Sequence, residues 1–105
     1  MKDNKAFVYF RDNPAGIIEK IPDGYRFTYN DEFIKDNVAI SRSLPLRREP
    51  YESKELFPFF SGLLPEGWYL DIVCSKLKID KNDKFAILAA SCEDTIGAVS
   101  IRKGI

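Results

Sequence analysis

Histidine, the side chain most often used for acid–base chemistry near neutral pH, is absent from this sequence. The chain therefore has no Ser-His-Asp or Cys-His triad, no HExxH zinc site and no mixed Cys/His metal site. Its two cysteines, Cys74 and Cys92, are far apart and do not form a CxxC motif. We expect no metal and no redox pair, but two small, partly buried thiols in a reducing compartment.

The other candidate acids, bases and nucleophiles lack the partners that catalysis needs. Glu66 and Asp71 flank Trp68, but acidic residues near a helix start are explained equally well by the helix dipole. Ser61 and Ser75 have no candidate base nearby. The glycines do not have the spacing of a phosphate-binding loop, and GxxxxGK[ST] does not occur. The sequence therefore predicts a protein that is not an enzyme and has no cofactor.

Charge is balanced over the chain, with 16 basic and 16 acidic residues. No overall field attracts nucleic acid or an anionic membrane, so neither is an expected partner of the protein alone. Arg42, Arg47 and Arg48 form a local basic run that is able to bind phosphate. Glu49 and Glu52 follow it directly, however, and no series of stacking aromatic residues accompanies it. This pattern also fits a solvated loop.

The first thirty residues predict three β-strands, because β-forming residues alternate with turn clusters there. A weaker fourth strand is expected after them, followed by an ordered loop stiffened by two prolines, and a last strand closes the chain. The predicted strands are 6–10, 16–21, 25–29, 37–43 and 98–102, with turns at 12–16 and 22–24 and the loop at 45–54.

The second half of the chain has a helical pattern. A short apolar helix or turn covers 56–60, and a helix with Pro65 in its first turn runs to about Leu77. A third helix has a plausible cap in Asp80, with Asp83 three residues on, and places Phe85, Leu88, Ala89 and Cys92 on one face. We expect Ile72, Phe85 and Leu88 to belong to the core.

Strands and helices occur in separate runs, which predicts an α+β fold. We expect one domain over residues 1–105: a small antiparallel sheet or open barrel of about five strands, capped by about three helices. With 105 residues, of which 45% are hydrophobic, the chain can build a core without disulfides or metal. No charged segment followed by an apolar one opens the sequence, and no apolar run approaches about 20 residues, so we expect a soluble, cytoplasmic protein.

The segment Leu63–Leu70 is the most informative for function. If a helix begins at Pro65, successive residues step about 100° around its axis. One broad apolar side then collects Tyr69, Leu70, Ile72, Val73, Cys74 and Leu77, while Trp68 lies off its centre, next to Asp71 and Ser75. An exposed Trp beside Gly67 is typical of a binding hot spot. Helical periodicity equally allows Trp68 to fold back over the sheet or the 45–54 loop.

Three blocks of the sequence resemble the N-terminal subdomain of HipA-family serine/threonine kinases. The most specific signal is FPFFSGLLPEGW, in the block that runs from Leu56 to Trp68, and it is supported by Ser43–Leu46 and Asp94–Ile101. The hairpins formed by the strands at 6–10 and 25–29 fit the same subdomain. The resemblance implies a small β-sheet capped by helices and docked on a kinase. The ATP lysine, catalytic Asp and metal ligands needed for phosphoryl transfer are not recognisable here.

The chain is also similar to HipS, the small antitoxin of tripartite HipBST systems. This similarity implies an inhibitor of a HipT/HipA-like kinase toxin, with a HipB-like DNA-binding protein as a possible further member of the complex. The partner-binding residues are then expected to be Leu64, Pro65, Glu66, Gly67, Trp68 and Asp71. Two alternatives stay open: an accessory subunit that completes a split kinase, and a fragment of a longer HipA, although Met1 and the lack of a tag favour a complete protein.

Overall fold

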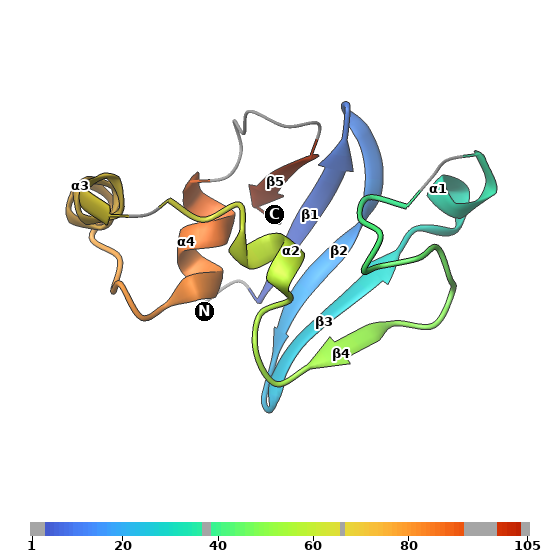
Figure 1. The fold of residues 1–105 in the computed structure, drawn as a ribbon, viewed down its shortest axis with the longest axis horizontal. Coiled ribbons are helices and arrows are strands. Elements are labelled where there is room, and N and C mark those ends of the chain that lie inside the picture. The colour runs from blue at the N-terminus through green and yellow to red at the C-terminus, as the bar shows by residue number, and fades with distance from the viewer. Residues whose placement is uncertain (1–3, 37–38, 66, 92–98, 104–105) are drawn as a thin grey trace.

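The structure, a computed structural model, describes residues 4–36, 39–65, 67–91 and 99–103. Five strands form one antiparallel sheet in the order β4-β3-β2-β1-β5. They are β1 (Lys5–Phe10), β2 (Asn13–Ile21), β3 (Gly24–Tyr29), β4 (Tyr51–Ser53) and β5 (Val99–Lys103). The helices are α1 (Asp31–Asp36), α2 (Pro58–Ser61), α3 (Gly67–Leu77) and α4 (Lys84–Ser91) (Figure 1). The predicted α+β fold with an open antiparallel sheet is confirmed.

Two tight hairpins join the first three strands. Arg11 and Asp12 connect β1 to β2 with φ angles of 50° and 69°, as a two-residue type I′ turn requires. β2 therefore begins at Asn13, before the predicted start of this strand. In the next turn Gly24 has a φ of 153°, and a Cβ there would lie 2.1 Å from the carbonyl oxygen of Ser53. Only glycine lets the end of β4 come this close.

The prediction of a fourth strand at 37–43 is wrong for the residues of that segment that the structure describes. Residues 39–43 form no strand, and their one β-bridge is an isolated one from Ser41 to Leu44; residues 37–38 lie outside the described ranges. The fourth strand is β4, which lies within the predicted loop 45–54. It pairs with β3 through Tyr51, which lies opposite Phe27.

A buried tyrosine explains why the segment after α1 is a loop. The Tyr29 hydroxyl donates a hydrogen bond to the carbonyl of Leu44 and accepts one from the N–H of Ile40 at 3.1 Å. These backbone groups are therefore satisfied by a side chain rather than by a strand. The sequence also missed helix α1, whose buried Phe33 stacks on Tyr29 with the ring centroids 5.9 Å apart. The described residues thus contain four helices rather than about three.

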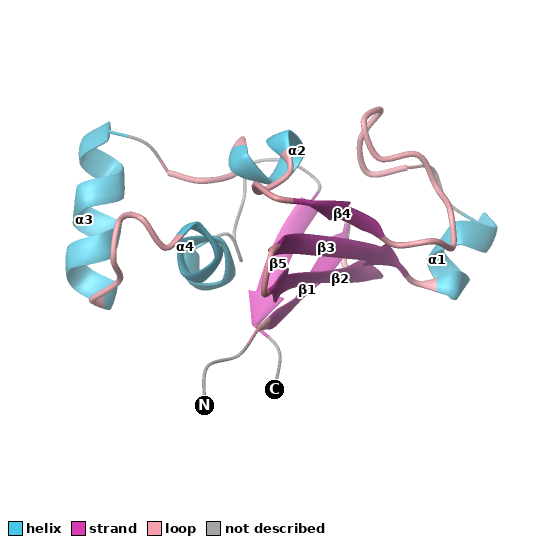
Figure 2. Ribbon diagram, turned by 90° about the horizontal axis from the view of Figure 1, so that it is seen from below, coloured by secondary structure: helices cyan, strands magenta, loops and turns pink. Residues whose placement is uncertain are grey.

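The core lies between one face of the sheet and helices α2 and α4 (Figure 2). Phe60 of α2 is fully buried, and its ring centroid lies 5.4 Å from that of Phe27 in β3. Phe85 and Leu88 of α4 are buried as predicted. Ile72, the third predicted core residue, is 42% exposed, so that prediction is wrong.

Helix α4 begins three residues later than a cap at Asp80 implies. Asp83 caps it, because its Oδ1 accepts the N–H of Ala86 at 3.1 Å. The carboxylate of Asp80 instead accepts the N–H of Asn82 at 2.9 Å and closes the preceding turn. No helix among the described residues is long and apolar enough to cross a membrane.

Candidate functional site

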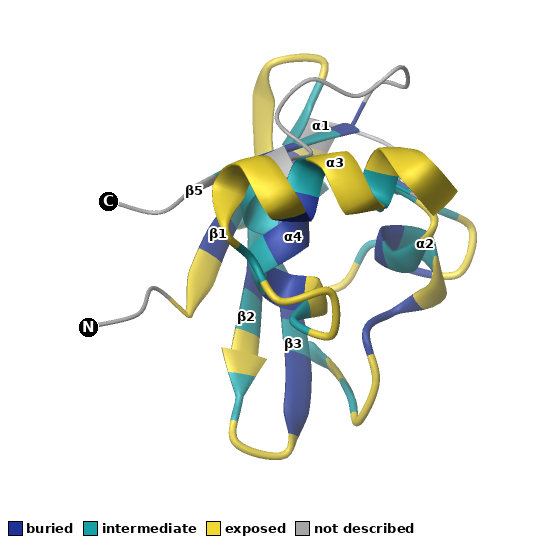
Figure 3. Cartoon of the chain, turned by 90° about the vertical axis from the view of Figure 1, so that its left-hand side faces the viewer, coloured by how far each residue is buried: buried dark blue, intermediate teal, exposed yellow. Residues whose placement is uncertain are grey.

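Helix α3 lies at the surface, and α4 separates it from the sheet (Figures 1 and 2). Most of its residues are exposed (Figure 3). Cys74 is its only buried residue among those the structure describes, and Leu70 and Val73 are half-buried. Because α3 packs on another helix through so small a contact, most of its apolar side chains remain available to a partner.

Trp68 is 74% exposed, so of the two arrangements that helical periodicity left open, the structure has the exposed one. Its ring meets that of Tyr69 edge-on, with the centroids 6.2 Å apart. Tyr69 is 55% and Leu77 49% exposed. The apolar side that the helical pattern predicts is thus largely uncovered, with Ile72 open as well. Sequence analysis did not identify Tyr69, Ile72 and Leu77 as surface residues. Periodicity shows that a helix has an apolar face, but it does not show what covers that face.

The start of α3 differs from the prediction. The helix begins at Gly67, and Pro65 precedes it rather than standing in its first turn. Gly67 has a φ of 57°, and a Cβ placed there would meet no atom within 4 Å. Glycine is therefore needed for its backbone conformation, while the space beside it is open. Glu66, between these two residues, lies outside the described part of the chain.

The segment that leads to Trp68 is anchored to the core. Leu63 and Leu64 are half-buried and pack against the core cluster. The N–H of Gly62 donates to the carbonyl of Pro58 at 3.0 Å, and that of Leu64 to the carbonyl of Ser61 at 3.2 Å. Helix α2 and the turn after it thus fix one end of the loop that presents Trp68.

Asp71, the remaining predicted site residue, forms an ion pair with Lys81 in the loop between α3 and α4. The hydrogen bond from Lys81 and the charge of Asp71 raise the pKa of Lys81 above its ordinary value. Both side chains are well exposed, so the pair contributes little to stability. Its role here is to link α3 to the loop that follows it.

The basic run of the 45–54 loop is partly occupied by contacts within that loop. Arg47 stacks on the ring of Tyr51 at 3.6 Å and donates to the carbonyls of Glu49 and Pro50, each at 3.0 Å. The Tyr51 hydroxyl donates to the carbonyl of Pro45 at 2.6 Å. Arg47 therefore shapes the loop, which does not favour the phosphate-binding interpretation.

The described residues hold no cluster of three or more Cys, Asp or Glu able to bind a metal. Cys74 is a free, buried thiol, and Cys92 lies outside the described ranges. The surface around α3 is an exposed apolar helix face with an aromatic residue, Trp68, near the start of the helix.

Comparisons with known proteins agree with this architecture. Residues 6–102 match the HipA N-terminal domain family. The chain is 31% identical over 103 residues to an uncharacterized protein of Haemophilus influenzae, covering 98% of this chain and 93% of that protein. It is 34% identical over 77 residues to Y4mE of Sinorhizobium fredii, a candidate kinase, covering 71% of this chain and 18% of that protein.

A solved structure described as the N-terminal domain of HipA toxin superposes with a TM-score of 0.75 and 26% sequence identity. The superposition covers 100% of this chain and 98% of that one. The family match extends over nearly the whole chain and includes the segment that presents Trp68. The chain therefore belongs to the HipA N-terminal domain family.

Proposed function

We propose that this protein is the antitoxin of a HipBST-like system, which binds a HipT/HipA-like serine/threonine kinase and inhibits it. The observation that carries the proposal is the 74% exposure of Trp68 at the start of α3, in a domain whose family is named for the N-terminal part of HipA. Trp is highly buried on average in folded proteins, and it is enriched among the residues that dominate binding energies.

In the proposed mechanism Trp68 and the segment 65–67 before it enter the kinase near its active site and obstruct the catalytic arrangement. A buried Trp anchor contributes about 2–4 kcal/mol to binding. Because Leu63 and Leu64 already pack against the core, they add little entropy cost when the neighbouring Trp68 binds the partner. The open space beside Gly67 leaves room for the backbone of the partner.

Autophosphorylation of a HipT-like kinase, measured with and without the protein, tests this function. We expect the reaction to fall with increasing protein and to stop near stoichiometric amounts. Ser75→Ala, an exposed change elsewhere on α3, should inhibit as well as the original protein. Unchanged autophosphorylation at saturating protein would contradict the antitoxin proposal.

A second candidate is an accessory subunit that completes a split kinase. It is favoured by the match to Y4mE, in which the similar region makes up only 18% of a longer protein. The same assay separates the two candidates, because an accessory subunit should raise autophosphorylation. In either role a HipB-like protein is a possible further partner. The balanced charge of the chain argues against direct DNA contact by this subunit alone.

A further inference from the structure

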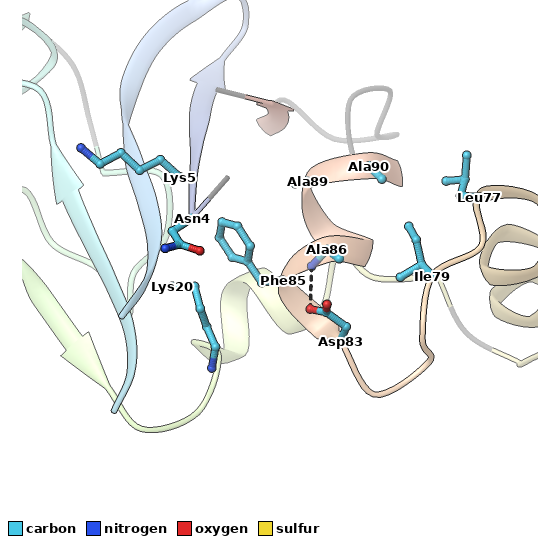
Figure 4. A pocket seen from close by; sticks show the side chains of 10 residues that line it. All are labelled: Asn4, Lys5, Lys20, Leu77, Ile79, Asp83, Phe85, Ala86, Ala89 and Ala90. Atoms are coloured by element: carbon cyan, nitrogen blue, oxygen red, sulfur yellow. Dashed lines mark hydrogen bonds between the residues drawn. The ribbon is translucent and has the colours of Figure 1, made fainter. Parts of the chain in front are cut away.

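We propose that a groove beside α3 seats an acidic, amphipathic helix of the kinase, a second contact that rests on the proposed function. The groove has a volume of about 480 Å³ and lies between α4, the end of α3 and the beginning of β1 (Figure 4). Its apolar lining consists of Leu77, Ile79, Phe85, Ala86, Ala89 and Ala90. This volume is within the range of pockets that bind sizeable groups.

The shape of the groove suits a helix. Ala86, Ala89 and Ala90 have the i, i+3, i+4 spacing that places side chains on one face of α4, and all three line the groove. Because these side chains are small, another helix can approach α4 closely. Phe85 points towards Asn4, at the start of β1, and closes one end of the groove (Figure 4).

An extended segment fits the groove less well than a helix. β1, the strand nearest to it, is paired with β2 on one side and β5 on the other, so it offers no free edge for strand addition. An extended chain lying there would leave backbone groups unpaired, whereas a helix satisfies its own.

The groove is continuous with the surface that carries Trp68. Tyr69, Val73 and Leu77 follow one another at i, i+4 and i+8 along α3, and Leu77 lines the groove. Helix α3 has 11 residues and so extends about 16 Å. A kinase that engages Trp68 at one end of α3 therefore reaches the groove at the other end.

Charge determines which kind of helix fits. Lys5 and Lys20 line the groove together with one carboxylate, Asp83, and Lys84 precedes Phe85 in the chain. None of these three lysines forms an ion pair with a described residue, although the Lys20 ammonium lies 4.5 Å from the centroid of the Tyr25 ring. The Asp83 carboxylate caps α4 by accepting the N–H of Ala86 and keeps its negative charge, so the lining carries two positive charges against one negative. A partner helix with an apolar face and flanking carboxylates is the complement of this surface.

The groove can be tested without the kinase. The probe is a fluorescein-labelled synthetic peptide of about 16 residues, with leucines at i, i+3, i+4 and i+7 and glutamates between them. Its control is a scrambled peptide of the same composition. We expect the patterned peptide to raise its anisotropy on binding and the scrambled one to bind about tenfold more weakly. Equal binding of the two peptides, or none, would overturn the proposal.

Variants of α4 distinguish shape-specific binding in the groove from non-specific electrostatic attraction. Both Ala90→Glu and Ala90→Lys place a larger side chain in the groove. Each should therefore weaken binding of the patterned peptide by about tenfold or more. Tighter binding to Ala90→Lys would mean attraction by charge alone and would overturn the proposal. Ser75→Lys, on α3 away from the groove, is the matched control and should bind as the original protein does. A melting temperature for each variant verifies that it is folded.

A pair of charge reversals tests the basic rim. The double variant Lys20→Glu with Lys84→Glu should weaken binding of the patterned peptide by about tenfold. The control double variant, Arg48→Glu with Lys54→Glu, makes the same charge change in exposed loops away from the groove. It should change the affinity for the peptide by less than about twofold. Equal losses in the two double variants would overturn the proposal. These results do not depend on kinase inhibition, so failure of the groove and failure of the proposed function are distinguishable.

Discussion

Leu88 and Ile72 lie on neighbouring helices in opposite environments, because one is fully buried and the other 42% exposed. Leu88→Ala should lower the free energy of unfolding by about 2–5 kcal/mol, through lost contacts and the cavity left behind. Ile72→Ala should cost less than about 1 kcal/mol. Chemical denaturation of both variants measures the difference. Equal losses would mean that α3 is packed against the core.

Tyr29 should make the free energy of unfolding depend on pH at alkaline values. Burial raises the pKa of Tyr29 above its ordinary value of 10.0, so the folded state favours the protonated hydroxyl. The stability that this provides is complete below pH 10.0 and is lost as the pH rises through the higher pKa of the folded state. We expect unfolding free energies to fall in that range.

Tyr29→Phe isolates this contribution. The variant leaves the buried carbonyl of Leu44 and the N–H of Ile40 without their hydroxyl partner, which should cost about 1–3 kcal/mol near neutral pH. Its stability should then decline less steeply above pH 10. Lys81, whose pKa is also raised, is present in both proteins, so the difference between their curves reports Tyr29. Parallel curves would contradict this assignment.

At the scale of the elements, two glycines near α3 should respond differently to alanine. Gly67 has a φ of 57°, and Gly67→Ala should cost about 1–2 kcal/mol because its backbone is left-handed. Gly62 has a right-handed φ of −67°, and a Cβ there would lie 3.5 Å from the Phe59 carbonyl. Gly62→Ala should be neutral or slightly stabilising. Thermal melting of both variants decides, and equal shifts would contradict the helix start described above.

The elements best predicted from sequence are those whose own pattern is sufficient. The strands at 6–10 and 25–29 alternate buried and outward side chains, and the apolar face of α4 gave Phe85 and Leu88. The fourth strand could not be found this way. Tyr51–Ser53 is too short to show a pattern, and its pairing with β3 depends on the absence of a side chain at Gly24. Helix α1 was not predicted either, because it too is short and shows no clear periodic pattern.

The site was predictable to a similar extent. Helical spacing at Trp68 allowed an exposed side chain as well as one folded back on the sheet, and the resemblance to HipS singled out the segment around it. Sequence could not show that Tyr69, Ile72 and Leu77 are also open, because that depends on α3 packing against α4 rather than the sheet. Nor could it show the groove, which joins residues of β1, α3 and α4. Distances between elements come only from the tertiary structure.

At the scale of the whole molecule, the domain combines a stable sheet core with a helix that contributes little to that core. In such a domain, substitutions on α3 can abolish binding to the partner without unfolding the core. The proposed antitoxin function therefore depends on whether the most exposed aromatic side chain is used for recognition. One variant separates stability from binding.

The most direct test is Trp68→Ala, measured by thermal melting and by calorimetric titration into a HipT-like kinase. Because Trp68 is 74% exposed, the variant should lose less than about 1.5 kcal/mol of stability, well below the roughly 3–5 kcal/mol of a buried Trp truncation. Its affinity for the kinase should fall by about thirtyfold, or about 2 kcal/mol. A variant that melts normally and still binds and silences the kinase at full strength would contradict the account.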